Sequence, residues 1–346
     1  MSPIIAVEEL VEHLRKSGSN NFALLSHQAS PVAERLVREF PSRIKSLFSA
    51  EHGWFGLALP GEKTSSSIHP YWNILVHSLY GETRRPTDEM LDGLHEVVID
   101  LQDIATRCYT YLATLKLMLE ECAKRSIKVT VLDRPVPFRG YEDGPMREEK
   151  FSSFVAPLNI PLRHGMTPGD CARFIVKDMN LNVELTIIES PFANLDTTIP
   201  WSNFMPPSPG IPNWDSAALY PATVFTEAFR SVDCDRGGAF SFRILGAKWI
   251  DANLLANELA SPLAEFGFQP IAYRYKSAFV KEDNIFDGIL LTLLHNGKYL
   301  PIEAAKFFFK ILIKKYPDEI IRDFRPEWLD KLAGTTSLRN ELFKSL

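Results

Sequence analysis

A glutamate stands beside a histidine in the stretch LFSAEHGWFG, which spans residues 47–56. Glu51 follows a short apolar run, and two large aromatic residues, Trp54 and Phe55, come soon after it. A carboxyl group can transfer the proton that hydrolysis of a glycosidic bond requires, and aromatic rings can stack on the face of a sugar. The stretch therefore predicts that Glu51 is a proton-transfer group. The alternative is a solvated carboxylate that only caps a turn at the end of a strand.

Residue types suited to sugar chemistry recur elsewhere in the chain. Carboxylates act as general acid, general base or nucleophile, and arginine or glutamine side chains hold sugar hydroxyls or a substrate carboxylate. His52 and His164 lie inside dense polar motifs, unlike the other histidines. A dehydratase or an isomerase could use the same set of residues. Besides Glu51, the candidates are Gln102, Asp103, Arg107, Tyr109, Asp133, Arg134 and Glu227.

Short β-prone runs alternate with helical stretches in the first half of the chain. Strands that alternate with helices are typical of a parallel sheet with helices on both faces, so we predict an α/β fold. The expected strands are residues 22–25, 44–48, 97–100 and 127–132, and the expected helices are residues 31–40 and 106–125.

A polar cluster follows each of these four predicted strands. The clusters are Ser26-His27-Gln28, Glu51-His52-Gly53, Asp100-Leu101-Gln102-Asp103 and Asp133-Arg134. Ligands bind at the carboxyl ends of the strands in open α/β sheets, so we expect these clusters to share one rim. The alternative is that loops are polar in any protein.

Several candidates have a structural alternative. Three polar residues in one turn cannot all face a crevice, so we expect Gln102 and Asp103 to contact ligand and Asp100 to be structural. Arg107 and Tyr109 are predicted to begin the helix that follows. Arg107 either neutralises an acidic substrate group or pairs with Asp103 one turn earlier.

Four other positions stay equally open. Asp133 and Arg134 are either ligand contacts or an internal pair at the junction of two domains. His164 either contacts ligand or packs at a hinge. His52 either binds ligand or orients its neighbour, and Gly53 is expected to adopt a positive φ or to let a ligand approach the backbone.

The second half of the chain is predicted to form a separate, smaller domain. Pro157 and Pro161 break regular structure, so we expect domains at residues 1–165 and 166–346. Thr167 followed by Pro and then Asp170 predicts the start of a helix. Residues 191–221 are predicted to be a long ordered loop, whose tryptophans either form a lid or simply pack.

The composition of the chain limits the kinds of partner that we expect. The chain has 346 residues and a formal net charge of −5, without a basic stripe, so neither nucleic acid nor an anionic membrane is an expected partner. The four cysteines, Cys108, Cys122, Cys171 and Cys234, are widely spaced and predicted to be structural thiols in a reducing compartment. No signal peptide and no run of about 18 apolar residues is evident, so we expect a cytoplasmic protein.

Familiar catalytic and cofactor motifs are missing. No GxGxxG follows the first predicted strand, and the chain has no P-loop, HExxH or GxSxG motif. The eight histidines lack metal-ligand spacing. We therefore expect neither a metal nor an organic cofactor.

Several longer motifs occur together in a fixed order. They are AEHGWFG, HSLYG, VVIDLQDIATRCYTYLATL, VLDRPVPFRG, IPLRHGMTPGDCA, PPSPGIP and YPATVFTEAF. This combination resembles the family of exo-β-N-acetylmuramidases of bacterial cell-wall recycling, from about residue 6 to the C-terminus. The resemblance implies a Rossmann-like N-terminal domain, a smaller α/β C-terminal domain and an active site between them.

The resemblance also implies an activity and a set of roles. The expected reaction is release of N-acetylmuramic acid, or a related amino sugar, from the non-reducing end of peptidoglycan fragments. Glu51 matches the glutamate of the family's EHG motif and is the expected general acid. Glu227, Asp133 or Asp233 is the expected second carboxylate. Arg107 is a candidate partner for the lactyl carboxylate of muramic acid.

The chain departs from the family pattern after Glu227. The family typically has EGTN followed by SEGRGT, whereas this chain reads EAFRSVDCDRGGAF from residue 227. Asp233 takes the second acidic position, and Arg236 is kept as a candidate substrate contact. Phe229 and Arg230 replace small and polar residues.

These changes leave two alternatives to the family activity. One is a degenerate member that binds amino sugars or muropeptides as a sensor or interaction protein, without turnover. The other is a glycosidase with a changed sugar substrate. Retention of EHG, LQD and LDRP favours catalysis, because simple binding needs no acid at a strand end.

Overall fold

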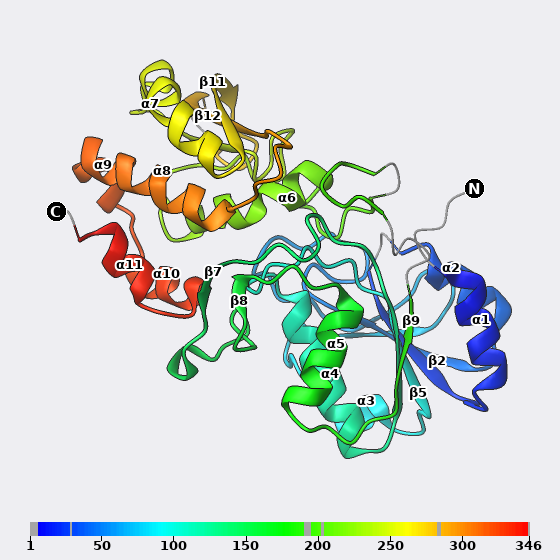
Figure 1. Cartoon of the computed structure of the whole chain (residues 1–346). Helices are drawn as coiled ribbons and strands as arrows, with labels where there is room; N and C mark the ends of the chain where they lie inside the picture. The colour runs from blue at the N-terminus through cyan, green and yellow to red at the C-terminus, as the bar shows by residue number, and fades with distance from the viewer. Residues whose placement is uncertain (1–5, 28–29, 190–194, 202–203, 282–284, 345–346) are drawn as a thin grey trace.

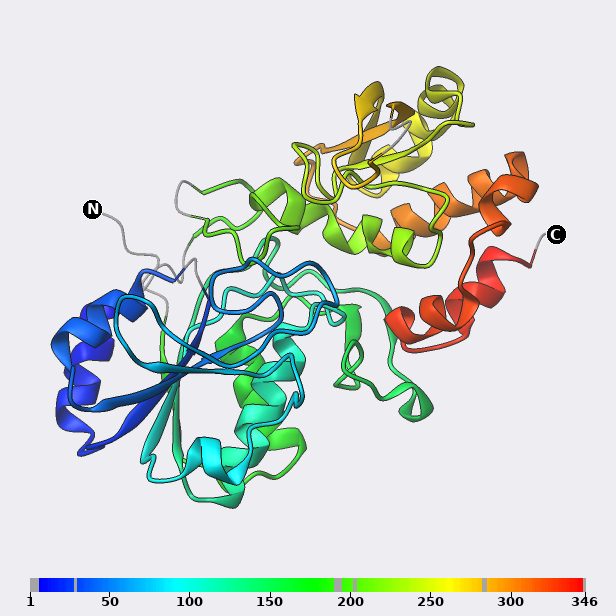
Figure 2. The same cartoon turned by 180° about the vertical axis from the view of Figure 1, so that it is seen from behind.

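The computed structural model describes residues 6–27, 30–189, 195–201, 204–281 and 285–344. Gln28 and parts of the predicted 191–221 loop lie outside these residues. A large sheet with helices on both faces forms the N-terminal part of the molecule (Figure 1). A smaller group of strands and helices from the second half lies over one end of this sheet, as both views show (Figure 2).

Within the described residues, the large sheet contains seven strands, and all neighbouring pairs are parallel except β3 with β4. The four predicted strands are confirmed to within one residue, and β3, β4 and β9 were not predicted. The strand order is β3 (Ser67–Ile68), β4 (Leu75–Ser78), β2 (Ile44–Ser49), β1 (Phe22–Ser26), β5 (Glu96–Ile99), β6 (Lys128–Leu132) and β9 (Leu185–Ile188).

The central strands are buried on both faces. Phe22 and Leu24 of β1 belong to the apolar cluster that includes α1 (Val7–Lys16) and α2 (Val32–Glu39). Ala23 and Leu25 alternate with them and belong to the larger cluster that includes α4 (Tyr111–Lys124) and α5 (Pro168–Asp178). Successive side chains of a strand point to opposite faces, so β1 must be apolar throughout.

The helices follow the predictions closely, with one exception. α5 begins as predicted, with Thr167 as N-cap and a capping box to Asp170. α4 begins at Tyr111, so the prediction that Arg107 and Tyr109 begin this helix is wrong. Ala105 has φ +56°, and the chain pairs with β8 (Pro161–Arg163) instead, where the Leu162 carbonyl accepts the N–H of Arg107 at 2.7 Å. A positive φ stops a helix from forming there.

A second sheet forms the centre of the smaller domain. Its three antiparallel strands, among the residues described, are β10 (Ile244–Ala247), β12 (Ile285–Leu293) and β11 (Phe268–Lys276), in that order. The α/β fold with a large, mostly parallel sheet and a smaller second domain is therefore confirmed. The main helices of this domain are α6 (Trp214–Thr223), α7 (Ala252–Glu265), α8 (Pro301–Lys315), α9 (Pro317–Ile321), α10 (Pro326–Ala333) and α11 (Ser337–Leu342).

The large sheet extends past residue 165, the predicted end of the first domain. β9 pairs with β6, and α5 packs on both strands. We propose that the domain boundary lies between β9 and α6 instead. The last part of the predicted 191–221 loop is helical, because Asn213 caps α6 and Trp214 begins it. The Trp214 side chain is buried, and its ring lies 6.2 Å from that of Trp201, which is packing rather than an open lid.

Buried polar contacts join the second half of the chain to the first domain. Arg107 is fully buried, and its guanidinium donates to the backbone carbonyls of Pro145 at 3.0 Å and of Ala333 in α10. The carboxylate of Asp143 in β7 (Asp143–Met146) accepts the N–H of Ile302 in α8 at 2.6 Å. A buried charge needs such partners, so these contacts fix where α8 and α10 dock.

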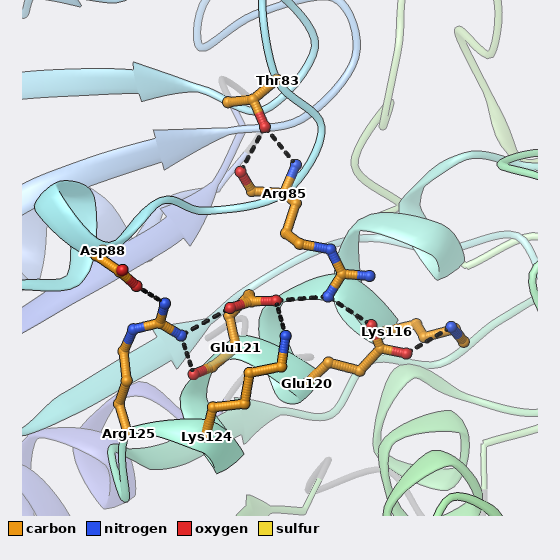
Figure 3. Close-up of polar contacts among 8 residues, drawn as sticks. All are labelled: Thr83, Arg85, Asp88, Lys116, Glu120, Glu121, Lys124 and Arg125. Carbon is orange, nitrogen blue, oxygen red and sulfur yellow. Dashed lines mark hydrogen bonds and ion pairs between the residues drawn. The ribbon is translucent and has the colours of Figure 1, made fainter.

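A network of ion pairs ties the C-terminal half of α4 to the segment around α3 (Asp88–Leu91) (Figure 3). Arg85 contacts Glu120 at 2.7 Å and Glu121 at 2.6 Å. Arg125 contacts Glu121 at 2.7 Å and also Asp88. Surface ion pairs contribute little singly, at about 0–1 kcal/mol each, but a network holds a helix end more firmly. In the described part of the chain, no helix is both long enough and apolar enough to cross a membrane.

Phe229, one of the departures from the family pattern, lies in the core of the second domain. Its ring is fully buried and stacks on Phe309 at 4.4 Å and Phe324 at 4.6 Å between ring centroids. We expect Phe229→Ala to lower the free energy of unfolding by about 3–5 kcal/mol, because the lost ring leaves a cavity. Urea unfolding measures this change. Phe279→Ala is the control, because that ring is 54% exposed, and an equal loss in both variants would contradict the assignment.

Candidate active site

A cavity of about 610 Å³ lies between the two domains. Loops that follow strands β2, β4 and β5 line it from the first domain, and segments around η2 (Val224–Glu227) and the start of α10 line it from the second. This is the carboxyl end of the parallel strands, where open α/β sheets bind ligands. Of the candidates, Glu51, His52, Tyr109, Glu227, Asp233 and Arg236 line this cavity.

Glu51 is held in the cavity wall by two hydrogen bonds. Its carboxylate accepts the backbone N–H of Gly61 at 2.8 Å and the hydroxyl of Thr110 at 2.6 Å. β2 ends at Ser49, and the backbone then turns sharply because His52 and Gly53 both have positive φ, +72° and +74°. The predicted positive φ of Gly53 is confirmed, and the turn presents the Glu51 side chain to the cavity.

His52 is positioned by its own loop. Its Nδ1 lies 2.9 Å from the carbonyl oxygen of Ala58, which closes the loop after Glu51. The ring still lines the cavity beside Glu51. The described contacts of the Glu51 carboxylate are with Gly61 and Thr110, so both roles given above for His52, ligand contact and orientation of its neighbour, stay predictions.

Glu227 brings a second carboxylate to the cavity from the other domain. Arg236 donates to it at 2.7 Å and the indole N–H of Trp328 donates at 3.3 Å. The Arg236 guanidinium also lies over the ring of Phe242, 5.1 Å from its centroid. A carboxylate bound by a cation and an indole has a defined orientation in the wall.

The negative charges of both carboxylates act on the hydroxyl of Tyr80. Burial, chiefly, and the negative charges of Glu51 and Glu227 raise the pKa of Tyr80 to about 12, against the opposing effect of Arg84. Charges act on a hydroxyl in this way only at short range. Glu51 and Glu227 both line the cavity, Glu51 from the first domain and Glu227 from the second.

Asp233 also lines the cavity, but its oxygens are already engaged. They accept hydrogen bonds from the hydroxyl of Tyr275 at 2.8 Å, from the hydroxyl of Ser277 at 3.1 Å and from the backbone N–H of Asp235 at 2.9 Å. Burial raises the pKa of Asp233. The Asp233 carboxylate thus holds its own loop to β11 and the residues that follow β11.

Gln102, Asp103 and Arg107 lie outside the cavity lining. The side-chain amide of Gln102 donates to the carbonyls of Asp103 and Pro135, both at 2.9 Å. The Asp103 carboxylate accepts the N–H of Ala105 at 2.7 Å, which fixes the turn before α4. Arg107 binds backbone carbonyls rather than Asp103 or a cavity group. Gln102 and Asp103 are held by their own turn and by Pro135, and Arg107 is held by carbonyls of distant segments, so all three side chains point into the protein interior.

Asp133, Arg134 and His164 lie outside the lining as well. Asp133 accepts the N–H of Gly169 at 2.7 Å at the start of α5, and Arg134 donates to Asp100 at 2.6 Å. His164 is buried, and its Nδ1 accepts the N–H of Met166 at 3.2 Å. All three side chains have partners inside the protein, but the predicted internal pair of Asp133 with Arg134 does not form, because Arg134 pairs with Asp100 and Asp133 binds Gly169.

The predicted stacking rings are placed elsewhere too. Trp54 is buried, 6.0 Å from the ring of His69 and 6.3 Å from that of Trp72, and Phe55 lies 5.2 Å from His69. Neither ring lines the cavity. Other aromatic side chains do so: Tyr80, Tyr220, Phe242, Phe279, Phe286 and Trp328.

Sequence reasoning missed several lining residues. Tyr80 occurs in the HSLYG motif and Thr110 in the YTY motif, but a single hydroxyl has no periodic pattern that marks it. Trp328 lies 101 positions after its partner Glu227. Pro326, at the first position of α10, marks the start of this helix but not the cavity beside it.

The cysteines are poor candidates for a nucleophile. All four are free and buried, and Cys108 and Cys234 line the cavity. Burial raises the pKa of the Cys108 thiol to about 12, with a further contribution from the negative charge of Glu227. Because the thiolate is the nucleophile, a thiol with a raised pKa is inert near neutral pH.

Asp103→Asn is expected to change how stability depends on pH. Burial raises the pKa of Asp103 to about 6, from a usual value of 3.8. A carboxyl group with a raised pKa in the folded protein stabilises it at low pH, and this contribution is lost as the pH rises through about 6. The loss amounts to about 3 kcal/mol, at about 1.4 kcal/mol per pKa unit.

The free energies of unfolding of the wild type and the variant, measured in urea at pH 4 and at pH 7, test this. From pH 4 to pH 7 the variant should gain about 2–3 kcal/mol relative to the wild type, because pH 4 already lies just above the unfolded pKa. Asp92→Asn, on the surface, is the control and should show no such gain. Identical pH profiles for the wild type and Asp103→Asn would refute the assignment.

Comparisons with known proteins identify the family of both halves of the chain. The family model described as exo-β-N-acetylmuramidase NamZ, N-terminal, matches residues 19–215, and its C-terminal counterpart matches residues 218–345. The two matches meet inside the first turn of α6, just after the boundary proposed above and well after β9.

Relatives and solved structures extend the comparison. Peptidoglycan β-N-acetylmuramidase NamZ of Bacillus subtilis (strain 168) is 31% identical over 310 residues, which are 87% of this chain and 73% of that protein. Two crystal structures of DUF1343 family proteins from Bacteroides fragilis NCTC 9343 share the fold. One has a TM-score of 0.82 at 24% identity, covering 96% of this chain and 90% of the other, and the second has 0.72 at 22%, covering 99% and 90%. The chain therefore belongs to the exo-β-N-acetylmuramidase NamZ family and carries both of its domains.

Proposed function

We propose that this protein is an exo-acting β-glycosidase. It releases N-acetylmuramic acid, or a related amino sugar, from the non-reducing end of peptidoglycan fragments. The observation that carries the proposal is that Glu51 and Glu227, from different domains, line one cavity of about 610 Å³. The name of the Bacillus relative supports the substrate class, and the description of the family model supports the exo mode.

Glu51 is the general acid in this proposal. As the bond between the anomeric carbon and the glycosidic oxygen breaks, the Glu51 carboxyl group gives its proton to that oxygen, which leaves as an alcohol. The hydrogen bonds from Gly61 and Thr110 hold the carboxyl group in one orientation, which proton transfer requires. The positive charge that develops on the sugar needs a carboxylate on the other side.

Glu227 is the second carboxylate. It either takes a proton from the water that attacks the anomeric carbon or attacks that carbon itself before water releases the sugar. Of the three predicted candidates, Asp133 is bound to the start of α5 and Asp233 is bound by Tyr275 and Ser277. Glu227 alone combines cavity exposure with an orienting cation, Arg236.

The changed motif after Glu227 supports catalysis rather than its loss. Phe229 fills the apolar core and takes no position in the cavity wall. The ion pair between Glu227 and Arg236 is kept. The main support for binding without turnover was the altered motif, and one of its changes, Phe229, is a packing change in the core.

Hydrolysis of chromogenic glycosides tests the proposal. We expect turnover of the β-N-acetylmuramide and weaker or no turnover of the β-N-acetylglucosaminide. Turnover of the glucosaminide alone would support the changed-sugar alternative. Saturable binding of an amino sugar by calorimetry, with no turnover of either glycoside, would overturn the proposal in favour of the sensor.

A further inference from the structure

Two arginines in the cavity wall are not neutralised by the protein. Arg230 and Arg325 both line the cavity. Across the residues that the structure describes, neither guanidinium pairs with a carboxylate or donates a hydrogen bond. Arg236, the third arginine of the wall, differs because it is bound to Glu227 at 2.7 Å.

The fold itself brings Arg230 and Arg325 together. Phe229 and Phe324 pair in an isolated antiparallel bridge, and their rings stack 4.6 Å apart in the core. The N–H of Arg325 donates to the carbonyl of Ala228 at 2.9 Å, which continues the pairing. The two phenylalanine rings pack with the core, whereas the two arginines that follow them in the chain line the cavity.

The carboxylates nearby do not serve as partners for these arginines. Glu227 is engaged by Arg236 and Trp328, and Asp233 by Tyr275 and Ser277. Two unpaired cations in the wall of a concave site attract an anion, and the guanidinium fork matches a carboxylate with two parallel hydrogen bonds. The wall therefore has the chemistry of a carboxylate-binding subsite.

We propose that Arg230 and Arg325 bind a carboxylate of the substrate and select acidic amino sugars over neutral ones. In a muramic acid residue this group is the lactyl ether carboxylate, and in a muropeptide the stem peptide supplies carboxylates instead. The inference rests on the proposed function for its ligand class. Arg107, the residue that sequence reasoning offered for this role, is fully buried against backbone carbonyls.

Calorimetric binding of three probes tests the subsite without requiring turnover. The probes are N-acetylmuramic acid, its methyl ester and an N-acetylmuramoyl dipeptide. The ester keeps the shape of the sugar but lacks the charge, and the dipeptide moves the carboxylates to the peptide. The proteins are the wild type, the double variant Arg230→Gln/Arg325→Gln, a matching double Lys variant and Arg322→Gln. Arg322 is exposed and lies outside the cavity lining. Its substitution by Gln removes a positive charge away from the cavity, so this variant controls for the change in net charge.

We expect the double Gln variant to bind the acid about 10-fold more weakly or worse, and the ester as well as the wild type does. The double Lys variant should recover part of the affinity, and Arg322→Gln should match the wild type. The same loss for the dipeptide but not for the free acid would assign the carboxylate to the stem peptide.

Two outcomes would overturn the subsite. One is a wild type that binds the acid no more tightly than the ester, or binds none of the probes. The other is an equal loss for acid and ester in the double Gln variant. Charge-dependent binding in a protein that hydrolyses neither glycoside would keep the subsite and reject the hydrolase, so the two proposals fail separately.

Discussion

Glu51→Gln is expected to lower kcat for the chromogenic β-N-acetylmuramide by about 10²–10⁴-fold, the usual contribution of a general acid. The amide has nearly the shape of the carboxyl group, and its oxygen can still accept the N–H of Gly61. It has no proton to give to the leaving oxygen. The Michaelis constant should change little, because the same atoms still line the cavity.

Glu62→Gln is the matched control for Glu51→Gln. This glutamate lies on the same loop, is exposed and lies outside the cavity lining, although it accepts the N–H of Leu59 at 2.8 Å. Its variant should keep wild-type kcat. A Glu51→Gln enzyme with kcat within a few-fold of the control would remove Glu51 from the proposed mechanism.

Glu227→Ala is expected to have an effect of similar size, about 10²–10⁴-fold in kcat, because the second carboxylate also acts directly on the reaction. The truncation leaves space beside Arg236, and a small anion such as azide can enter it. If Glu227 acts as nucleophile or base, added azide should restore part of the turnover and yield a glycosyl azide. The anomeric configuration of the sugar that the wild type first releases then distinguishes the two routes, because a nucleophile gives retention and a general base gives inversion.

Asp233→Asn tests whether Asp233, the third carboxylate of the cavity lining, has the role proposed for Glu227. Asp233 is bound by Tyr275 and Ser277, so its variant should lose stability rather than azide-dependent activity. Thermal unfolding and kcat, measured together, distinguish these effects. Azide rescue in an Asp233 variant, without rescue in Glu227→Ala, would exchange the roles of the two residues.

The strands of the large sheet were predictable because their signals are local. Consecutive residues of β1 pack alternately against the two core clusters, and the same holds for β5. β3 has only two residues and β4 four, so neither offers a pattern long enough to detect. Both exist because a neighbouring strand already provides a hydrogen-bonding edge.

The candidate site was predictable only in part, for the same reason. Glu51 could be found because a strand end and a motif mark it. Gln102 and Asp103 have the same local signals, yet their side chains bind carbonyls and N–H groups of the turn itself and of Pro135. Which way a polar side chain points depends on partners that sequence spacing does not reveal.

The sequence by itself determined the α/β class, the main strands of the large sheet and the position of Glu51 at the end of β2. Periodicity and chain order are short-range properties, so they can be read from neighbouring residues. Only the tertiary structure decided which polar groups share a cavity. Glu51, Glu227 and Arg325 are far apart in the chain, and they meet because the buried contacts of Arg107 and Asp143 dock the second domain over the carboxyl ends of the strands.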